Sequence, residues 1–284
     1  MKEIKKNLCL IPLYAWSAVF IILPLAIVIY YAFTSDTGSG VALSLENFAN
    51  FFTEPEFFEA ILQSFKVAVI STVVCIFCGY PVAYILARSK SRAKFIIIVL
   101  MLLPMWMNFL IRTYSWLVLL EKTGLINTFL SLFGIEPIIF LKSEFGVIIV
   151  SVYDYLPFMV MPIYITLLKL DQSHLDAAAD LGANPFLVFM KVTLPFSLPG
   201  ILSGISMVFV PSVTTFVISK IMSSGNVTLI GDIIEKKFRS DLVSSWHFGS
   251  AISVVIMVIV LAFMYFVNRG DDDNMAGNGG KLLR

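Results

Sequence analysis

The sequence predicts an all-α integral membrane protein with six transmembrane helices. Of its 284 residues, 58% are hydrophobic and only 14% are charged, with a mean hydropathy of +0.90. Soluble domains carry about 25% charged residues, so this composition points away from water. The net charge of +1 and the three cysteines disfavour a nucleic-acid-binding protein and a disulfide-rich scaffold.

Six apolar stretches follow one another along the chain. Four contain no Asp, Glu, Lys or Arg, namely Leu8–Ser35, Val67–Ala87, Val192–Ser219 and Phe248–Asn268. Two more carry one charge each, Arg112 in Phe95–Leu120 and Asp154 in Phe145–Leu168. About 20 helical residues cross a bilayer core, and peptide groups in hydrocarbon must be paired within the segment, so each stretch is expected to be a helix. The first stretch has a basic front but is too long for a signal peptide, which favours a retained anchor.

The distribution of Lys and Arg predicts the orientation. With the N-terminus inside, the cytoplasmic segments hold 12 of these residues and the outer segments hold 6. Cytoplasmic connections are enriched in Lys and Arg, so both termini are expected in the cytoplasm of a bacterial cell, with the chain crossing its membrane several times.

The expected organisation has three parts. Residues 1–61 are expected to form an anchor helix and an acidic outer loop, 62–268 a domain of five transmembrane helices, and 269–284 a disordered cytoplasmic tail rich in Asp, Asn and Gly. An apolar stretch at Val227–Ile234, in the last outer connection, is expected to form a short interfacial helix.

The cytoplasmic connection at 170–196 carries the strongest local signal. Ser173 followed by Asp176 predicts a capped helix start, and Gly182 is suited to the left-handed turn that ends the helix. Asn184 and Pro185 then predict the cap and first position of a second helix that runs toward Pro195. The pattern is helix, tight turn, helix, immediately outside the membrane, and an ordinary interfacial loop is the alternative interpretation.

The spacing of this connection resembles the EAA loop of binding-protein-dependent ABC importer permeases, E-A-A-x3-G-x9-I-x-L-P. The matching positions here are Asp176, Ala177, Ala178, Gly182, Val192, Leu194 and Pro195, with Asp in place of Glu and Val in place of Ile. The resemblance implies the type I (MetI-like) permease fold and a loop that docks on an ATP-hydrolysing partner.

Further segments resemble the spermidine/putrescine branch of that family. They are Leu103–Asn108 with Leu110–Tyr114, Tyr155–Pro162, and Leu229–Asp232. This resemblance implies half of a translocation path for polyamines. It also implies partners: a second homologous permease, an ATPase dimer that binds ATP and Mg²⁺, an extracellular polyamine-binding protein, and the surrounding membrane lipid. Candidate pathway residues are Trp106, Asn108, Arg112, Tyr114, Asp154 and Tyr155.

The two intramembrane charges have two readings. In straight helices, Arg112 and Asp154 would lie roughly 12 Å and roughly 14 Å from the outer ends of their spans. Similar depth favours a structural ion pair, and the competing reading is that Asp154 faces the pathway and meets a cationic substrate. Prolines 104, 157, 162, 199 and 211 are expected either to kink the spans mildly or to serve as gating bends.

Catalytic and metal-binding patterns are missing from the sequence. It contains no G-x4-GK-[ST], G-x-S-x-G or H-E-x-x-H motif, and its two histidines are far apart. Cys75 and Cys78 lie inside an apolar span, where packing is the expected role. We therefore expect a transport subunit that binds no cofactor or metal and depends on a separate partner subunit for ATP hydrolysis. The alternatives are a permease for another small solute, or a secondary transporter or channel, which would show internal repeats with broken helices.

Overall fold

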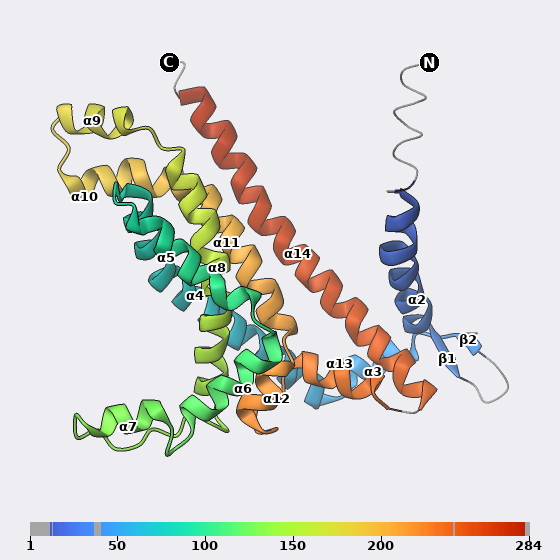
Figure 1. The fold of residues 1–284 in the computed structure, drawn as a ribbon. Coiled ribbons are helices and arrows are strands. Elements are labelled where there is room, and N and C mark those ends of the chain that lie inside the picture. The colour runs from blue at the N-terminus through green and yellow to red at the C-terminus, as the bar shows by residue number, and fades with distance from the viewer. Residues whose placement is uncertain (1–11, 13, 37–40, 241, 282–284) are drawn as a thin grey trace. The chain divides into compact units, whose positions relative to one another are not determined.

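The computed structural model describes residues 12, 14–36, 41–240 and 242–281, and these are mainly helical (Figure 1). In chain order the first elements are η1 (Ala18–Ile22), α2 (Leu23–Ala32), β1 (Thr34–Asp36), β2 (Val41–Leu43), α3 (Glu46–Thr53), α4 (Pro55–Arg88), α5 (Ala93–Leu102), η2 (Leu103–Trp106) and α6 (Phe109–Leu120). They are followed by α7 (Leu125–Ser131), α8 (Glu144–Leu168), α9 (Gln172–Asp180), α10 (Pro185–Val188), η3 (Phe189–Thr193), α11 (Leu194–Thr214), α12 (Val217–Ser223), α13 (Ile230–Phe238) and α14 (Val243–Lys281).

Five helices in the described part of the chain are long and apolar enough to cross a membrane. They are Tyr14–Ala32, Pro55–Arg88, Glu144–Leu168, Pro185–Thr214 and Ser244–Val267, and the bent pair Ala93–Trp106 with Phe109–Ser131 raises the number to six. The six predicted spans are thus recovered, although part of the first prediction lies outside the described residues.

The third span is not the straight helix that the sequence predicted. Its two halves meet at an angle of 101°. The break follows Pro104, where a short 3₁₀ segment ends and Met107 becomes extended, with ψ at 151°. Asn108 then begins α6 as an N-cap, its Oδ1 accepting from the amides of Leu110 and Ile111. The remaining flagged prolines, 157, 162, 199 and 211, lie within continuous helices.

The residues group into two compact units. One comprises the described residues up to Glu59 together with Ile233–Leu261, and the other comprises Ala60–Asp232 together with the residues from Ala262 onward. Most of the last span of the predicted 62–268 domain groups with the N-terminal part, because α14 contacts that part.

Within the first unit, His247 of α14 makes those contacts. Its Nδ1 lies 3.0 Å from both Thr34 Oγ1 and Tyr31 O, and the ring is almost fully buried. Strands β1 and β2 form a small antiparallel hairpin in which Thr34 pairs with Leu43. The all-α prediction did not include this hairpin. Its strands have three residues each, which is too short for an alternating pattern to reveal them.

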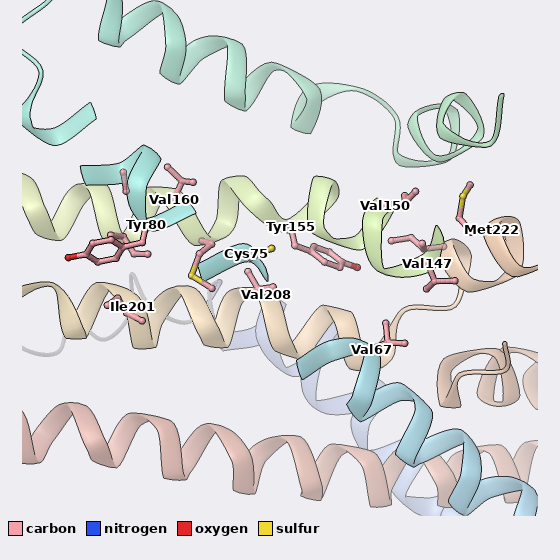
Figure 2. Packing of buried hydrophobic residues seen from close by; sticks show 14 of the residues in the cluster. Val67, Cys75, Tyr80, Val147, Val150, Tyr155, Val160, Ile201, Val208 and Met222 are labelled. Carbon is pink, nitrogen blue, oxygen red and sulfur yellow. The ribbon is translucent and has the colours of Figure 1, made fainter. Parts of the chain in front are cut away.

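The second unit has its core between α4, α8, α11 and α12. Figure 2 shows Cys75 and Tyr155 lying between the ribbons of α8 and α11, in line with the packing role expected for Cys75. The two helices approach closely where α11 carries glycine. A Cβ at Gly200 would lie 2.6 Å from Thr166 Oγ1 and 2.8 Å from Pro162 O. Small residues permit such close packing of membrane helices.

Two predicted segments differ from expectation, the interfacial helix before the last span and the C-terminal tail. The interfacial helix expected at Val227–Ile234 begins later, at Ile230, because Asp232 Oδ2 accepts from the Leu229 amide at 2.9 Å and organises the turn before α13. The tail expected to be disordered continues α14 to Lys281. Extending an existing helix is far easier than nucleating one, which gives a physical reason for this continuation.

Candidate functional site

The first helix of the cytoplasmic connection is capped by a residue that the sequence analysis did not choose. Helix α9 begins at Gln172, and Asp171 is its N-cap, with Oδ1 accepting from the Ser173 amide at 3.1 Å. Hydrogen bonds from Ser173 lower the pKa of the Asp171 carboxyl below its usual range. The predicted start at Ser173 was therefore wrong by two residues, because the carboxylate two positions earlier is the better acceptor for the first amides.

Asp176, at the acid position of the motif, lies exposed on α9. Its Oδ1 accepts from Gln172 Nε2 at 2.9 Å, and Gln172 Oε1 accepts from Arg88 at the end of α4 at 3.0 Å. Leu175 is buried and anchors the helix on its inner side. These two hydrogen bonds connect Asp176 on α9, through Gln172, to Arg88 at the end of α4.

The turn after α9 has the predicted conformation. Gly182 has a φ of +86°, and among the described residues nothing lies within 4 Å of a Cβ placed there. The amide of Gly182 donates to Ala179 O at 2.8 Å, and that of Ala183 donates to Ala178 O at 3.1 Å. The requirement for glycine is therefore one of backbone conformation and not of space.

The second helix starts as predicted but does not end at Pro195. Asn184 Oδ1 accepts from the Leu187 amide at 2.8 Å, and Pro185 occupies the first helical position. Helix α10 then continues through the π turn η3 into α11, so that Pro185–Thr214 is one span of 30 residues. Pro195 lies inside this continuous span, directly after the π turn η3 and Leu194.

The end of α10 is fixed against α4 by aromatic contacts. The ring of Phe189 lies edge-on to Tyr80 at 5.8 Å and to Tyr84 at 5.7 Å. Tyr80 Oη lies 3.0 Å from Ser197 Oγ on α11. Val192 and Leu194 of the motif are half-buried in this region, whereas Pro195 is exposed.

Two apolar residues at the tip of the connection were missed by the sequence analysis. Leu181 is 89% exposed and Phe186 is 71% exposed, on either side of the Gly182 turn. Ala177, one helical turn before Leu181, is exposed as well, while Ala178 is half-buried. A large apolar residue directly before a predicted left-handed glycine was the available signal. We call Ala177, Leu181 and Phe186 the tip residues.

The intramembrane charges form an ion pair. Arg112 Nε lies 2.7 Å from Asp154 Oδ1, and the two side chains are 10% and 0% exposed. Arg112 Nη1 also donates to Pro104 O at 2.7 Å, and its guanidinium lies 5.5 Å from the centroid of the Phe109 ring. Arg112 thereby links α8 to both sides of the break in the third span. The ion pair that equal depth favoured is present, although the straight-helix geometry behind that estimate was wrong.

Of the other pathway candidates, only Tyr155 is buried like this pair. Trp106 and Tyr114 are exposed on the surface of the unit, and Asn108 caps α6. Tyr155 is buried, and its Oη donates to Pro211 O at 3.4 Å. The structure therefore separates a buried group, Arg112, Asp154 and Tyr155, from an exposed group, Trp106, Asn108 and Tyr114.

Among the described residues, no group of three or more His, Cys, Asp or Glu side chains is placed to hold a metal ion. Figure 1 shows α9 and α10 at one end of α8 and α7 at its other end, so the capped connection lies at one membrane surface. The candidate spans and the capped connection define a multi-span membrane protein.

Comparison with known proteins identifies the family. The family model described as "Binding-protein-dependent transport system inner membrane component" matches residues 76–270. The chain belongs to this family.

Its relatives include named permeases of similar length. The chain is 35% identical over 262 residues to the spermidine/putrescine transport system permease protein PotB of Haemophilus influenzae, covering 89% of this chain and 90% of the relative. It is 34% identical to PotB of Escherichia coli K12, covering 88% and 92%. It is 29% identical to the inner membrane ABC transporter permease protein YdcU of the same strain, covering 84% and 80%.

Two solved structures share the fold at 16% identity. One is a bacterial ABC transporter involved in the import of alginate, with a TM-score of 0.74 over 96% of this chain and 98% of that chain. The other is a bacterial alginate ABC transporter in complex with a pentasaccharide-bound periplasmic protein, with a TM-score of 0.77 over 94% and 95%.

Proposed function

We propose that this chain is a permease subunit of an ATP-driven ABC importer and forms half of a translocation path for polyamines such as spermidine and putrescine. The observation that carries the proposal is 35% identity over about nine-tenths of the chain to a spermidine/putrescine permease. The fold alone does not select the substrate, because transporters of an acidic polysaccharide share it.

The proposed assembly has a second homologous permease, an ATPase dimer that holds ATP and Mg²⁺, and an extracellular binding protein that delivers the substrate. This chain binds no cofactor itself. Both termini lie in the cytoplasm, as the excess of Lys and Arg in the corresponding segments supports. That orientation puts the connection at 170–196 on the side of the ATPase.

The α9–α10 connection is the proposed coupling element. Asp176, Ala177, Ala178 and Gly182 match the family's motif, and the exposed tip residues extend its apolar surface. Association buries apolar surface, so Leu181 and Phe186 are suited to enter a groove of the ATPase. Because α10 is continuous with α11, closure of the ATPase dimer moves a span directly.

Reconstitution tests the proposal. The chain is co-expressed with the permease, ATPase and binding protein encoded by neighbouring genes, and the complex is placed in proteoliposomes loaded with ATP. We expect uptake of radiolabelled spermidine or putrescine that requires both internal ATP and the binding protein. ATP-dependent uptake of a sugar or an amino acid with no polyamine uptake would contradict the substrate assignment while leaving the importer assignment in place.

A further inference from the structure

The outer connection between α6 and α8 contains a folded segment. This segment, residues 121–143, includes α7. Asn127, almost fully buried, holds it together: its Nδ2 donates to Glu121 O and to Ile138 O, each at 3.0 Å, and its Oδ1 accepts from the Ile138 amide at 2.8 Å. At its end, the Lys142 amide donates to Met222 O at 2.8 Å. The segment is thus fixed to the second unit.

Helix α7 has three sides of different character. Ile126 and Leu130 pack against the hydrophobic core of the unit. Thr128 and Ser131 are exposed and polar, with their hydroxyls donating to Gly124 O and Thr128 O. At 100° per residue, Leu125 and Phe129 fall on the remaining side, and Leu132 and Phe133 follow directly after the last helical residue.

Leu125, Phe129, Leu132 and Phe133 form a large exposed apolar surface. Their side chains are between 59% and 77% exposed, and the rings of Phe129 and Phe133 pack edge-on at 5.2 Å. We call these four residues the α7 apolar face. The sequence has no charged residue between Lys122 and Glu136. A fixed apolar patch of this kind in water marks a contact with a partner or a membrane.

The surroundings of α7 favour lipid as the occupant. The segment joins two membrane spans, and Val118 near the end of α6 is exposed like the four residues of the α7 apolar face. Figure 1 shows α7 running across the direction of α8, at the end opposite to α9 and α10. Helices that lie in the membrane interface have an apolar side toward the acyl chains and a polar side toward water.

The composition of the face supports the same choice. Helices that lie in the membrane interface carry residues such as Trp, Phe and Leu on the side that enters the acyl boundary. The α7 apolar face contains only Leu and Phe. We propose that α7 lies in the outer membrane–water interface, with Leu125, Phe129, Leu132 and Phe133 in the lipid and Thr128 and Ser131 in water.

Site-directed spin labelling tests this placement in the assembled transporter. Cys9, Cys75 and Cys78 are replaced by Ala, and a nitroxide is attached to Leu132→Cys or Phe133→Cys on the apolar face. Thr128→Cys and Ser131→Cys are the matched controls one side away on the same helix. Each complex is placed in lipid nanodiscs, and accessibility to oxygen and to a water-soluble nickel chelate is measured by power saturation. Retained binding-protein-stimulated ATP hydrolysis confirms that each labelled complex is assembled.

We expect labels at 132 and 133 to be several-fold more accessible to oxygen than to nickel, and labels at 128 and 131 to show the reverse. Low accessibility to both reagents at 132 and 133 would mean that a protein subunit covers the face. High nickel accessibility at those positions would mean that the face lies in water. Either result overturns the proposal.

Discussion

Arg112 Nε on α6 and Asp154 Oδ1 on α8 lie 2.7 Å apart in the interior of the second unit, with the carboxylate wholly buried. The same guanidinium donates to Pro104 O, on the other side of the break in the third span. The Arg112 side chain therefore neutralises the buried Asp154 carboxylate and also connects the two halves of the bent third span. In this conformation a substrate does not reach Asp154 without rearrangement of the pair.

Breaking this pair is expected to destabilise the protein. Asp154→Asn and Arg112→Gln should each cost about 3–5 kcal/mol of unfolding free energy, because removal of one partner leaves the other charge buried and uncompensated. The double variant should recover much of the loss. Thermal unfolding of the four complexes provides the measurement, and Lys66→Gln, which removes an exposed ion pair with Glu144, is the control, with a cost of about 0–1 kcal/mol. Additive losses would reject energetic coupling, and lost polyamine uptake with unchanged stability would assign Asp154 to the substrate path.

Gly182→Val is expected to uncouple ATP hydrolysis from the loaded binding protein. A φ of +86° disfavours a β-branched residue by about 1–2 kcal/mol, so the turn should rearrange even though space is available for the side chain. Gly134→Val is the matched control, since Gly134 also has a positive φ, of +73°, with open space around it. It lies in the outer segment and should leave the stimulation of ATP hydrolysis intact. Gly182→Asn should retain most coupling, because Asn tolerates this conformation.

Replacing the tip residues should weaken the association with the ATPase. Leu181→Ser with Phe186→Ser removes two exposed apolar side chains at the loop tip, and we expect at least a tenfold loss of ATPase co-purification at limiting concentration. This corresponds to about 1.4 kcal/mol. Leu132→Ser, on the opposite side of the membrane and equally exposed, is the control. Equal recovery from both variants would exclude these side chains from the interface.

The acid position of the motif gives a charge test. Asp176→Glu should be tolerated, since it keeps the charge and adds one methylene, whereas Asp176→Lys should lower ATPase recovery. Asp176→Asn keeps an acceptor for Gln172 and separates the local hydrogen bond from the charge. If recovery of the ATPase from the Lys variant equals that from the unmodified chain, the acid is not part of the docking surface.

Close packing between α8 and α11 predicts a steric effect at Gly200. A Cβ there meets the backbone oxygen of Pro162 at 2.8 Å, so Gly200→Ala should cost about 1–3 kcal/mol through overpacking. Gly79→Ala is the control, because its Cβ would meet side-chain atoms of Met159 and Val160 at 3.2 Å, which have more freedom to adjust. Thermal unfolding in detergent compares the two, and equal midpoints would show that α8 and α11 separate at little cost.

The sequence alone determined the features that depend on composition and local backbone chemistry. Long charge-free stretches predicted the spans, because peptide groups in hydrocarbon leave the helix as the only pairing available to a single segment. Gly182, Asn184 and Pro185 predicted the turn and the second helix start, since each acts on its own backbone or on an amide a few residues away.

Tertiary structure decided the features that depend on which distant groups meet. The third span bends by 101°, and α14 groups with the N-terminal unit through His247. Neither follows from periodicity, because each depends on contacts between residues that are separated in sequence. The depth of Arg112 and Asp154 suggested a pair, but only the packed structure showed that Arg112 also holds Pro104, and that Leu181 and Phe186 remain uncovered at the tip.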